Sequence, residues 1–274
     1  MSASPTGYGQ TLYNLGPWFI LAGVLIIYLI AVVRQSSRTN RPWSHWRTAS
    51  FFAGVGLIAI ALSPPLAHLA HHNLRGHMIQ HLLIGMVAPL GLVFAAPLTL
   101  AFRTLPVRTS RGIISVLRSR PGHWLSHPVT ALILNIGGMY LLYLTPLYAL
   151  TLTTPSLHTL MHIHFLLAGC LFTWTIAGPD PAPNRPRLSI RLIVLFFGIA
   201  AHTYLSKLMY IYLWPAHTPY SPAEIQMAAK LMYYGGDLVE LLLVIALFAT
   251  WYRQRGRRPY NYPSAGVNLN YPSP

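Results

Sequence analysis

Charged residues are scarce in this sequence. They make up 8% of the 274 residues, and only four of them are acidic, whereas a typical soluble domain is roughly 25% charged. Hydrophobic residues account for 54% of the chain. Because so few charges could not cover the surface of a soluble protein, the composition predicts a chain surrounded by lipid.

Cysteine is nearly absent. The single residue, Cys170, lies inside an apolar run. It excludes an internal disulfide and any Cys-x-x-Cys metal or redox motif. We interpret it as a packing residue.

The formal net charge of +15 does not indicate nucleic-acid binding. Lysine and arginine occur in short tracts between apolar runs and form no stripe with interleaved aromatic residues. The distribution therefore predicts a lipid bilayer as the surroundings and no nucleic-acid partner.

Seven apolar runs approach the roughly 20 residues that cross the hydrocarbon core as a helix. They predict an all-α, polytopic membrane protein, a bundle of seven transmembrane helices over residues 17–254. Residues 1–16 are expected to form an outer N-terminal segment before an uncleaved first span, and residues 255–274 a disordered cytoplasmic tail. The predicted spans are Trp18–Val33, Thr48–Leu66, His77–Phe102, Pro128–Leu150, Leu157–Gly178, Leu192–Trp214 and Ala223–Tyr252.

The basic residues predict the orientation. With seven spans, most of the nineteen lysines and arginines fall in one set of connections, and the opposite set holds only Arg75. The positive-inside rule makes the first set cytoplasmic, with the N-terminus outside. That set is Arg34, Arg38, Arg41, Arg47, Arg103, Arg108, Arg111, Arg118, Arg120, Arg185, Arg187, Arg191, Arg253, Arg255, Arg257 and Arg258.

Prolines predict where helices break. Pro64 and Pro65 should end the second helix, and Pro89 and Pro97 should bend the third, because proline cannot donate a backbone hydrogen bond.

Ten of the thirteen histidines gather toward the predicted outer side. His77 and His81 are four residues apart and share a helix face, as do His158 and His162. Two such pairs on different helices can meet inside a bundle and bind a metal. The ten are His68, His71, His72, His77, His81, His158, His162, His164, His202 and His217.

Copper is the metal that this composition favours. Imidazole binds copper, zinc and iron, and thioethers suit Cu(I). We predict His77, His81, His158 and His162 as ligands, with His202, near mid-membrane, and Met78 as supplementary ligands. His68, His71 and His72 are placed in an outer loop, and His164 is expected to be structural. The simpler interpretation is that each histidine is only a helix–helix hydrogen-bond partner.

A second polar set lies on the last two predicted spans. Asp237 is two helical turns beyond Lys230 on the same face, and Glu240 lies a turn deeper, while Lys207 should sit at the depth of Lys230. An ion pair that neutralises buried charge and a path for a proton or cation both fit this spacing.

Two stretches resemble the signature motifs of the CtaG family, the caa3-type cytochrome c oxidase assembly factors. One is HMIQHLLIGMVAP, from His77 to Pro89. The other is HTLMHIHFLLAG, from His158 to Gly169, with the later GPDP turn at 178–181. A third segment, residues 224–237, is less similar, because Ile225 stands where the family commonly has glutamine. The resemblance spans about residues 15–255.

The resemblance implies a bacterial inner-membrane protein, not an enzyme, that helps to build a haem-copper oxidase. Its task would be to bind or deliver copper at the outer face. The implied partners are oxidase subunits and outer-compartment copper chaperones.

Two alternatives come from the residues themselves. A haem-binding membrane oxidoreductase would use the same histidine pairs as axial ligands. A transporter would carry a cation along Lys230, Asp237 and Glu240, although no inverted repeat is visible. No arrangement of residues suggests hydrolytic catalysis.

Overall fold

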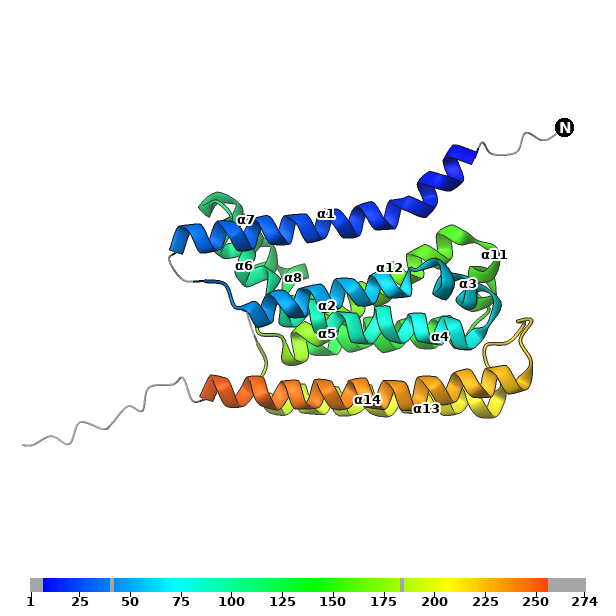
Figure 1. The fold of residues 1–274 in the computed structure, drawn as a ribbon. Coiled ribbons are helices and arrows are strands. Elements are labelled where there is room, and N and C mark those ends of the chain that lie inside the picture. The colour runs from blue at the N-terminus through cyan, green and yellow to red at the C-terminus, as the bar shows by residue number, and fades with distance from the viewer. Residues whose placement is uncertain (1–6, 40–41, 183–184, 256–274) are drawn as a thin grey trace, which may run out of the picture.

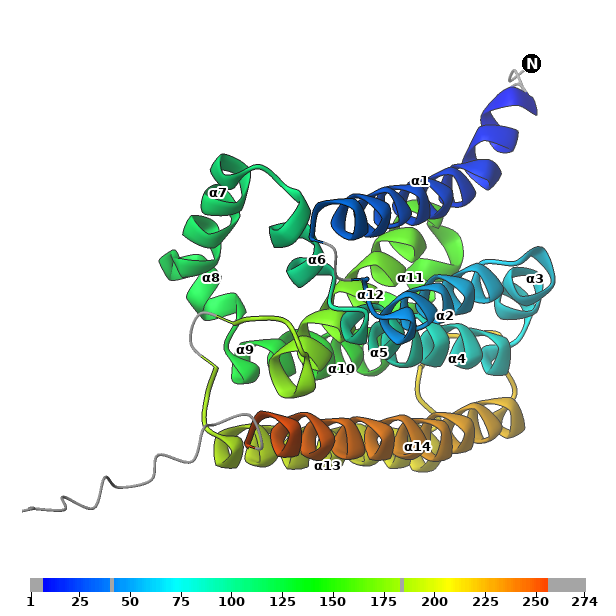
Figure 2. The ribbon, with the colours of Figure 1, turned by 60° about the vertical axis from the view of Figure 1, so that its left-hand side comes forward.

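The fold is a bundle of long helices that run back and forth along a common direction (Figures 1 and 2). The computed structural model describes residues 7–39, 42–182 and 185–255, and in these ranges it contains helices and no strand. The predicted tail at 255–274 therefore lies almost entirely outside the described residues. The four longest helices are α1 (Gly7–Thr39), α12 (Pro155–Ala177), α13 (Leu188–Tyr212) and α14 (Pro222–Arg255).

Five stretches of the described chain are long and apolar enough to cross a membrane, and the number rises to seven if each of two bent helix pairs is one span. The bends measure 52° between α2 and α3 and 76° between Leu144 and Leu147. The shorter helices are α2 (His45–Ala61), α3 (Pro64–His72), α4 (Leu74–Leu82), α5 (Ala88–Phe94), α6 (Pro97–Thr104), α7 (Val107–Arg118), α8 (Arg120–Leu125), α9 (Pro128–Leu132), α10 (Gly138–Leu144) and α11 (Leu147–Thr153), together with the π-helical turns η1 (Leu83–Val87) and η2 (Ile133–Gly137).

The break after α2 occurs where the two prolines predicted it. Pro64 and Pro65 cannot donate to the carbonyls of Ile60 and Ala61, four residues earlier. Other groups replace them: the Ser63 hydroxyl donates to the Ile60 oxygen at 2.7 Å, and the side-chain amide of Gln80 donates to the Ala61 oxygen at 2.7 Å. The second contact fixes α4 against the end of α2, which matters because α4 carries His77 and His81.

The third predicted span is interrupted differently from expectation. The helix widens into the π-helical turn η1 just before Pro89, and Leu74–Phe94 continues as one candidate span. The wider turn relieves the clash between the Pro89 ring and the Gly85 carbonyl. The chain then breaks at Ala96, which has a φ of 54°, and Pro97 begins α6.

Small residues allow the central helices to approach closely. A Cβ atom at Gly91 of α5 would lie 2.7 Å from the backbone nitrogen of Gly54 in α2. One at Gly169 of α12 would collide with the carbonyl oxygen of Gly85 in η1. These contacts hold α2, α5, η1 and α12 together at the centre of the bundle.

The two ends of the bundle differ. At one end lie α6, α7, α8 and the C-terminal ends of α1 and α14, which we call the arginine end (left in Figure 1). At the other lie α3, α11, the starts of α4 and α12, and the α13–α14 connection, which we call the histidine end. The expected outer segment 1–16 is partly helical, because α1 already begins at Gly7.

Candidate metal centre

The start of α4 holds His77 in place at the histidine end. The Asn73 side chain accepts a hydrogen bond from the Arg75 backbone N–H at 2.8 Å and so caps the helix. Gly76 allows α3 to pack directly on this first turn, since a Cβ there would come within 2.6 Å of the Leu69 backbone. His77 and His81 then lie one turn apart on α4, and both are buried.

Helix α12 brings a second pair to the same place. The His158 and His162 rings lie 4.4 Å apart, and the His77 ring lies 6.0 Å from His158 and 6.2 Å from His162, centroid to centroid. One ring nitrogen from each of His77, His158 and His162 lies within 4.8 Å of the others. Of the described residues, these form the one group of three or more histidine, cysteine or acidic side chains with that spacing.

A small cavity separates the two helices. Its volume is about 10 Å³, close to that of a single water-sized sphere. Its lining comprises His77, His81, Ile84, Leu142, Thr151, His158, Met161, His162 and Phe165. The four histidines of this lining are referred to below as the histidine cluster.

Several ring nitrogens of the histidine cluster are buried without a hydrogen-bond partner. They are Nε2 of His77, Nε2 of His162 and both ring nitrogens of His81. A buried polar atom with no partner costs about 1–3 kcal/mol. These nitrogens are therefore available to a bound water molecule or cation.

Two buried tyrosines form one wall beside the cluster. The Tyr148 ring lies 4.9 Å from His77, edge to face, and Tyr143 lies 6.1 Å from His81. The Tyr143 hydroxyl lies 3.7 Å from the sulfur of Met78 and donates to it. Met78, a predicted ligand, is thus buried and engaged by Tyr143 and does not line the cavity, whereas Met161 does.

His202 lies apart from the triad of nitrogens. It is fully buried on α13, and its Nδ1 atom lies 3.4 Å from a carboxylate oxygen of Glu240 on α14. The structure therefore pairs this predicted supplementary ligand with an acidic residue.

The remaining histidines of this end have separate positions. The expected outer loop is instead the short helix α3, on which the exposed His68 and His72 rings lie 4.5 Å apart. His71 lies 5.2 Å from His158, at the mouth of the cluster. The ring of His164 contacts the Leu134 carbonyl in η2 at 3.1 Å, in agreement with a structural role.

Lys230, Asp237 and Glu240, which were expected to form one polar path, have separate contacts in the structure. Lys230 and Lys207 are exposed and lie over the rings of Tyr210 and Tyr233, at 5.5 Å and 5.9 Å. Asp237 accepts a hydrogen bond from Thr203 at 3.3 Å. No lysine pairs with either acid in the part of the chain that the structure describes. The two lysines lie over tyrosine rings instead.

Sequence reasoning missed two features. Glu240 has a partner in His202, thirty-eight residues away, and no local pattern signals this pairing. The Asp180 carboxylate of the GPDP turn accepts hydrogen bonds from the backbone of Leu98 at 3.0 Å and of Thr99 at 2.8 Å, and so caps α6. This cap also joins segments far apart in the chain, and no local pattern signals it.

These features define a class: a multi-helix membrane protein with a histidine cluster between its helices at one end. The model of the family described as cytochrome c oxidase caa3 assembly factor (Caa3_CtaG) matches residues 26–254. The chain belongs to this family.

Three mycobacterial proteins are similar to this chain. Uncharacterized proteins of Mycobacterium bovis and Mycobacterium tuberculosis are each 29% identical over 253 residues, and one of Mycobacterium leprae is 29% identical over 252 residues. Each alignment covers 85% of this chain but only 38% of the relative. No solved structure matches the chain.

Proposed function

We propose that this protein binds Cu(I) at its histidine end and delivers it to a haem-copper cytochrome c oxidase during assembly. His77, His158 and His162 are the principal ligands, with Met161 beside them and His81 beneath. The partners would be oxidase subunits that receive the metal and, on the outer side, copper chaperones that supply it. The family supports the task in oxidase assembly.

One observation carries the proposal: three imidazoles from two helices present ring nitrogens within 4.8 Å of one another. Imidazole nitrogens bind a first-row metal at about 2.0–2.1 Å, so nitrogens around one ion lie about 3–4 Å apart. Rotamer adjustments alone would close the triad around an ion. A thioether at the same cavity favours Cu(I) among the metals that imidazole binds.

The same geometry favours an ion over haem. The cavity between the histidines measures about 10 Å³, whereas a porphyrin needs a slot several hundred cubic ångströms in volume. The close packing of α12 on η1 through Gly169 and Gly85 leaves no such slot. We therefore prefer copper handling to the haem-bearing oxidoreductase.

The topology that accompanies this proposal has seven spans. Each bent helix pair counts as one span, the arginine end faces the cytoplasm under the positive-inside rule, and the histidine end faces outward. Copper then arrives from the outer compartment of a bacterial inner membrane. Labelling of single cysteines placed in the α13–α14 connection and in α7, from outside intact cells, tests this orientation.

Titration of the purified chain with Cu(I) under reducing conditions tests the site. The parent should bind one Cu(I) tightly, and a His158→Ala, His162→Ala double variant should lose more than about 100-fold in affinity. His68→Ala, His72→Ala is the matched control, since this pair also has a four-residue spacing but is exposed on α3. Equal binding by the parent and the His158/His162 variant would refute the site.

Cells that lack the protein test the task. Their oxidase should contain less copper and regain activity on the parent gene, but not on the double variant. A fully metallated oxidase in these cells would refute a role in copper delivery.

A further inference from the structure

Midway along the bundle, α13 and α14 bury an imidazole and a carboxylate against each other. His202 is 0% exposed and Glu240 is 6% exposed. His202 Nδ1 and Glu240 Oε1 are 3.4 Å apart, and the two groups form an ion pair if the imidazole is protonated. Ionisable groups at this depth are costly and mark function more often than packing.

The contact between His202 and Glu240 leaves most of their hydrogen-bonding atoms without a partner. Nδ1 and Nε2 of His202 and Oε2 of Glu240 are all buried without a hydrogen-bond partner. Inside a membrane no bulk water reaches such groups, and each unsatisfied group costs several kcal/mol. Their donor set is one carboxylate and one imidazole, which is typical of sites for divalent transition metals.

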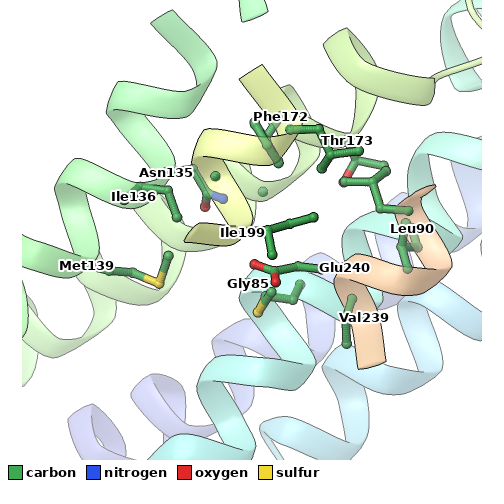
Figure 3. Close-up of a pocket in the computed structure, with 15 residues that line it drawn as sticks. Gly85, Leu90, Asn135, Ile136, Met139, Phe172, Thr173, Ile199, Val239 and Glu240 are labelled. Atoms are coloured by element: carbon green, nitrogen blue, oxygen red, sulfur yellow. The ribbon is translucent and has the colours of Figure 1, made fainter. Parts of the chain in front are cut away.

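A cavity opens directly in front of Glu240. Its volume is about 30 Å³, which accommodates about two water molecules. Figure 3 shows the Glu240 carboxylate next to Gly85 and Ile199, with the polar side chains of Asn135 and Thr173 among the other lining residues. Most of the lining is apolar, so the cavity's main contribution is room for water molecules beside the carboxylate.

Both π-helical turns border this cavity. Gly85 comes from η1, and Asn135 and Ile136 come from η2. Single π turns inside α-helices occur frequently at functional sites, because they redirect side chains and free backbone carbonyls. Two such turns from separate spans meeting at one cavity indicate a built site.

Glycine makes room for the imidazole of the pair. A Cβ atom at Gly236 of α14 would collide with the His202 ring. Any larger residue at Gly236 would displace His202 from Glu240. His81 lines the cavity of the histidine cluster and belongs to α4, which packs against α14, the helix that carries Glu240.

From this arrangement we infer that His202 and Glu240, together with the cavity that Glu240 lines, form a second metal position, which holds a divalent transition-metal ion deeper in the bundle than the histidine cluster. A harder donor set than that of the cluster separates the two positions chemically: imidazole with carboxylate here, imidazoles with a thioether there. The inference rests on the proposed function for the route of entry, which passes the cluster.

Zinc is the probe that tests the second position. The full chain, purified in detergent micelles and first loaded with one Cu(I) under reducing conditions, is titrated with Zn²⁺. The parent should take up one further Zn²⁺. Glu240→Gln should weaken this uptake by more than about tenfold, with Cu(I) binding unchanged.

Asp237→Asn is the matched control. It removes the other acid of the same helix, three residues away, which contacts Thr203 and does not line the cavity. This variant should bind Zn²⁺ as the parent does. Equal Zn²⁺ uptake by the parent and Glu240→Gln, or an equal loss in both variants, would overturn the inference.

The outcome separates the two proposals. If the parent binds no Cu(I) but binds Zn²⁺ more tightly than Glu240→Gln does, the proposed function is refuted and the second position is supported. If the parent binds Cu(I) tightly but Glu240→Gln does not change Zn²⁺ binding, the proposed function is supported and the second position is refuted.

Discussion

The histidine cluster and the His202–Glu240 pair both contain buried imidazoles, but the imidazoles have different partners in the two regions. The cluster lies at one end of the bundle and combines imidazoles of α4 and α12 with a thioether. The pair lies midway along α13 and α14 and combines an imidazole with a carboxylate. The comparison teaches that the partner of a buried histidine, more than the histidine itself, decides which cation it suits.

The largest expected effects test whether His81 binds Cu(I) together with His77, His158 and His162. His77→Ala removes the α4 member of the nitrogen triad and should weaken Cu(I) binding by about 100-fold, whereas His81→Ala should cost about tenfold or less. Competition with a Cu(I) chelator measures both. Equal losses would place His81 in the triad and move the boundary between the regions.

Crowding the pair tests whether its geometry depends on Gly236. Gly236→Ala places a methyl group against the fully buried His202 ring and should destabilise the protein by about 1–3 kcal/mol, as overpacking does. The midpoint of unfolding in SDS measures the loss. Gly235→Ala is the control, because its Cβ meets only the flexible end of Leu82, and it should lose less.

Asp180 and Glu240 are both buried, but Asp180 accepts several hydrogen bonds, whereas Glu240 has one long contact. Asp180 accepts hydrogen bonds from the backbone and side chain of Thr99 and from Leu98, so Asp180→Asn should destabilise the fold by about 1–2 kcal/mol. Glu240→Gln should be neutral or stabilising, since the carboxyl group has a single long contact at 3.4 Å and the amide keeps its shape without a charge to bury. The reverse order in an SDS-unfolding assay would contradict this account.

The smallest effect concerns the thioether. Met161 lines the cavity of the cluster, so Met161→Leu should weaken Cu(I) by about fivefold and leave Zn²⁺ unchanged, because zinc gains little from soft sulfur. Met78→Leu is its control, since the sulfur of Met78 faces Tyr143. A larger Cu(I) loss for Met78→Leu would restore Met78 as a ligand.

Much of the candidate site could be predicted from spacing along single helices. The four-residue spacing of His77 with His81, and of His158 with His162, places each pair on one face, and the structure brings the two faces together. The choice of thioether could not be predicted, because Met78 and Met161 are each next to a cluster histidine in sequence. Only the packing of Tyr143 against Met78 distinguishes them.

The positions of the helix breaks could be predicted from the prolines, but the local geometry and contacts at each break could not. Pro64 and Pro65 end α2 as expected, but the Gln80 side chain that replaces the missing donor comes from another span. Near Pro89 the helix widens into η1, where Gly85 packs closely against Gly169 of α12. A contact between distant segments accompanies each break.

Hydrophobicity and charge are properties of each short stretch of chain, and so the sequence by itself determined an all-helical membrane protein with arginines at one end and histidines at the other. The family followed from motifs that are equally local. Only the tertiary structure decided that His202 faces Glu240, that Lys230 lies over Tyr210 of the neighbouring helix, and that two π-helical turns share one cavity. The reason is that the rotation of one helix against another depends on packing between residues far apart in the chain, which no single stretch encodes.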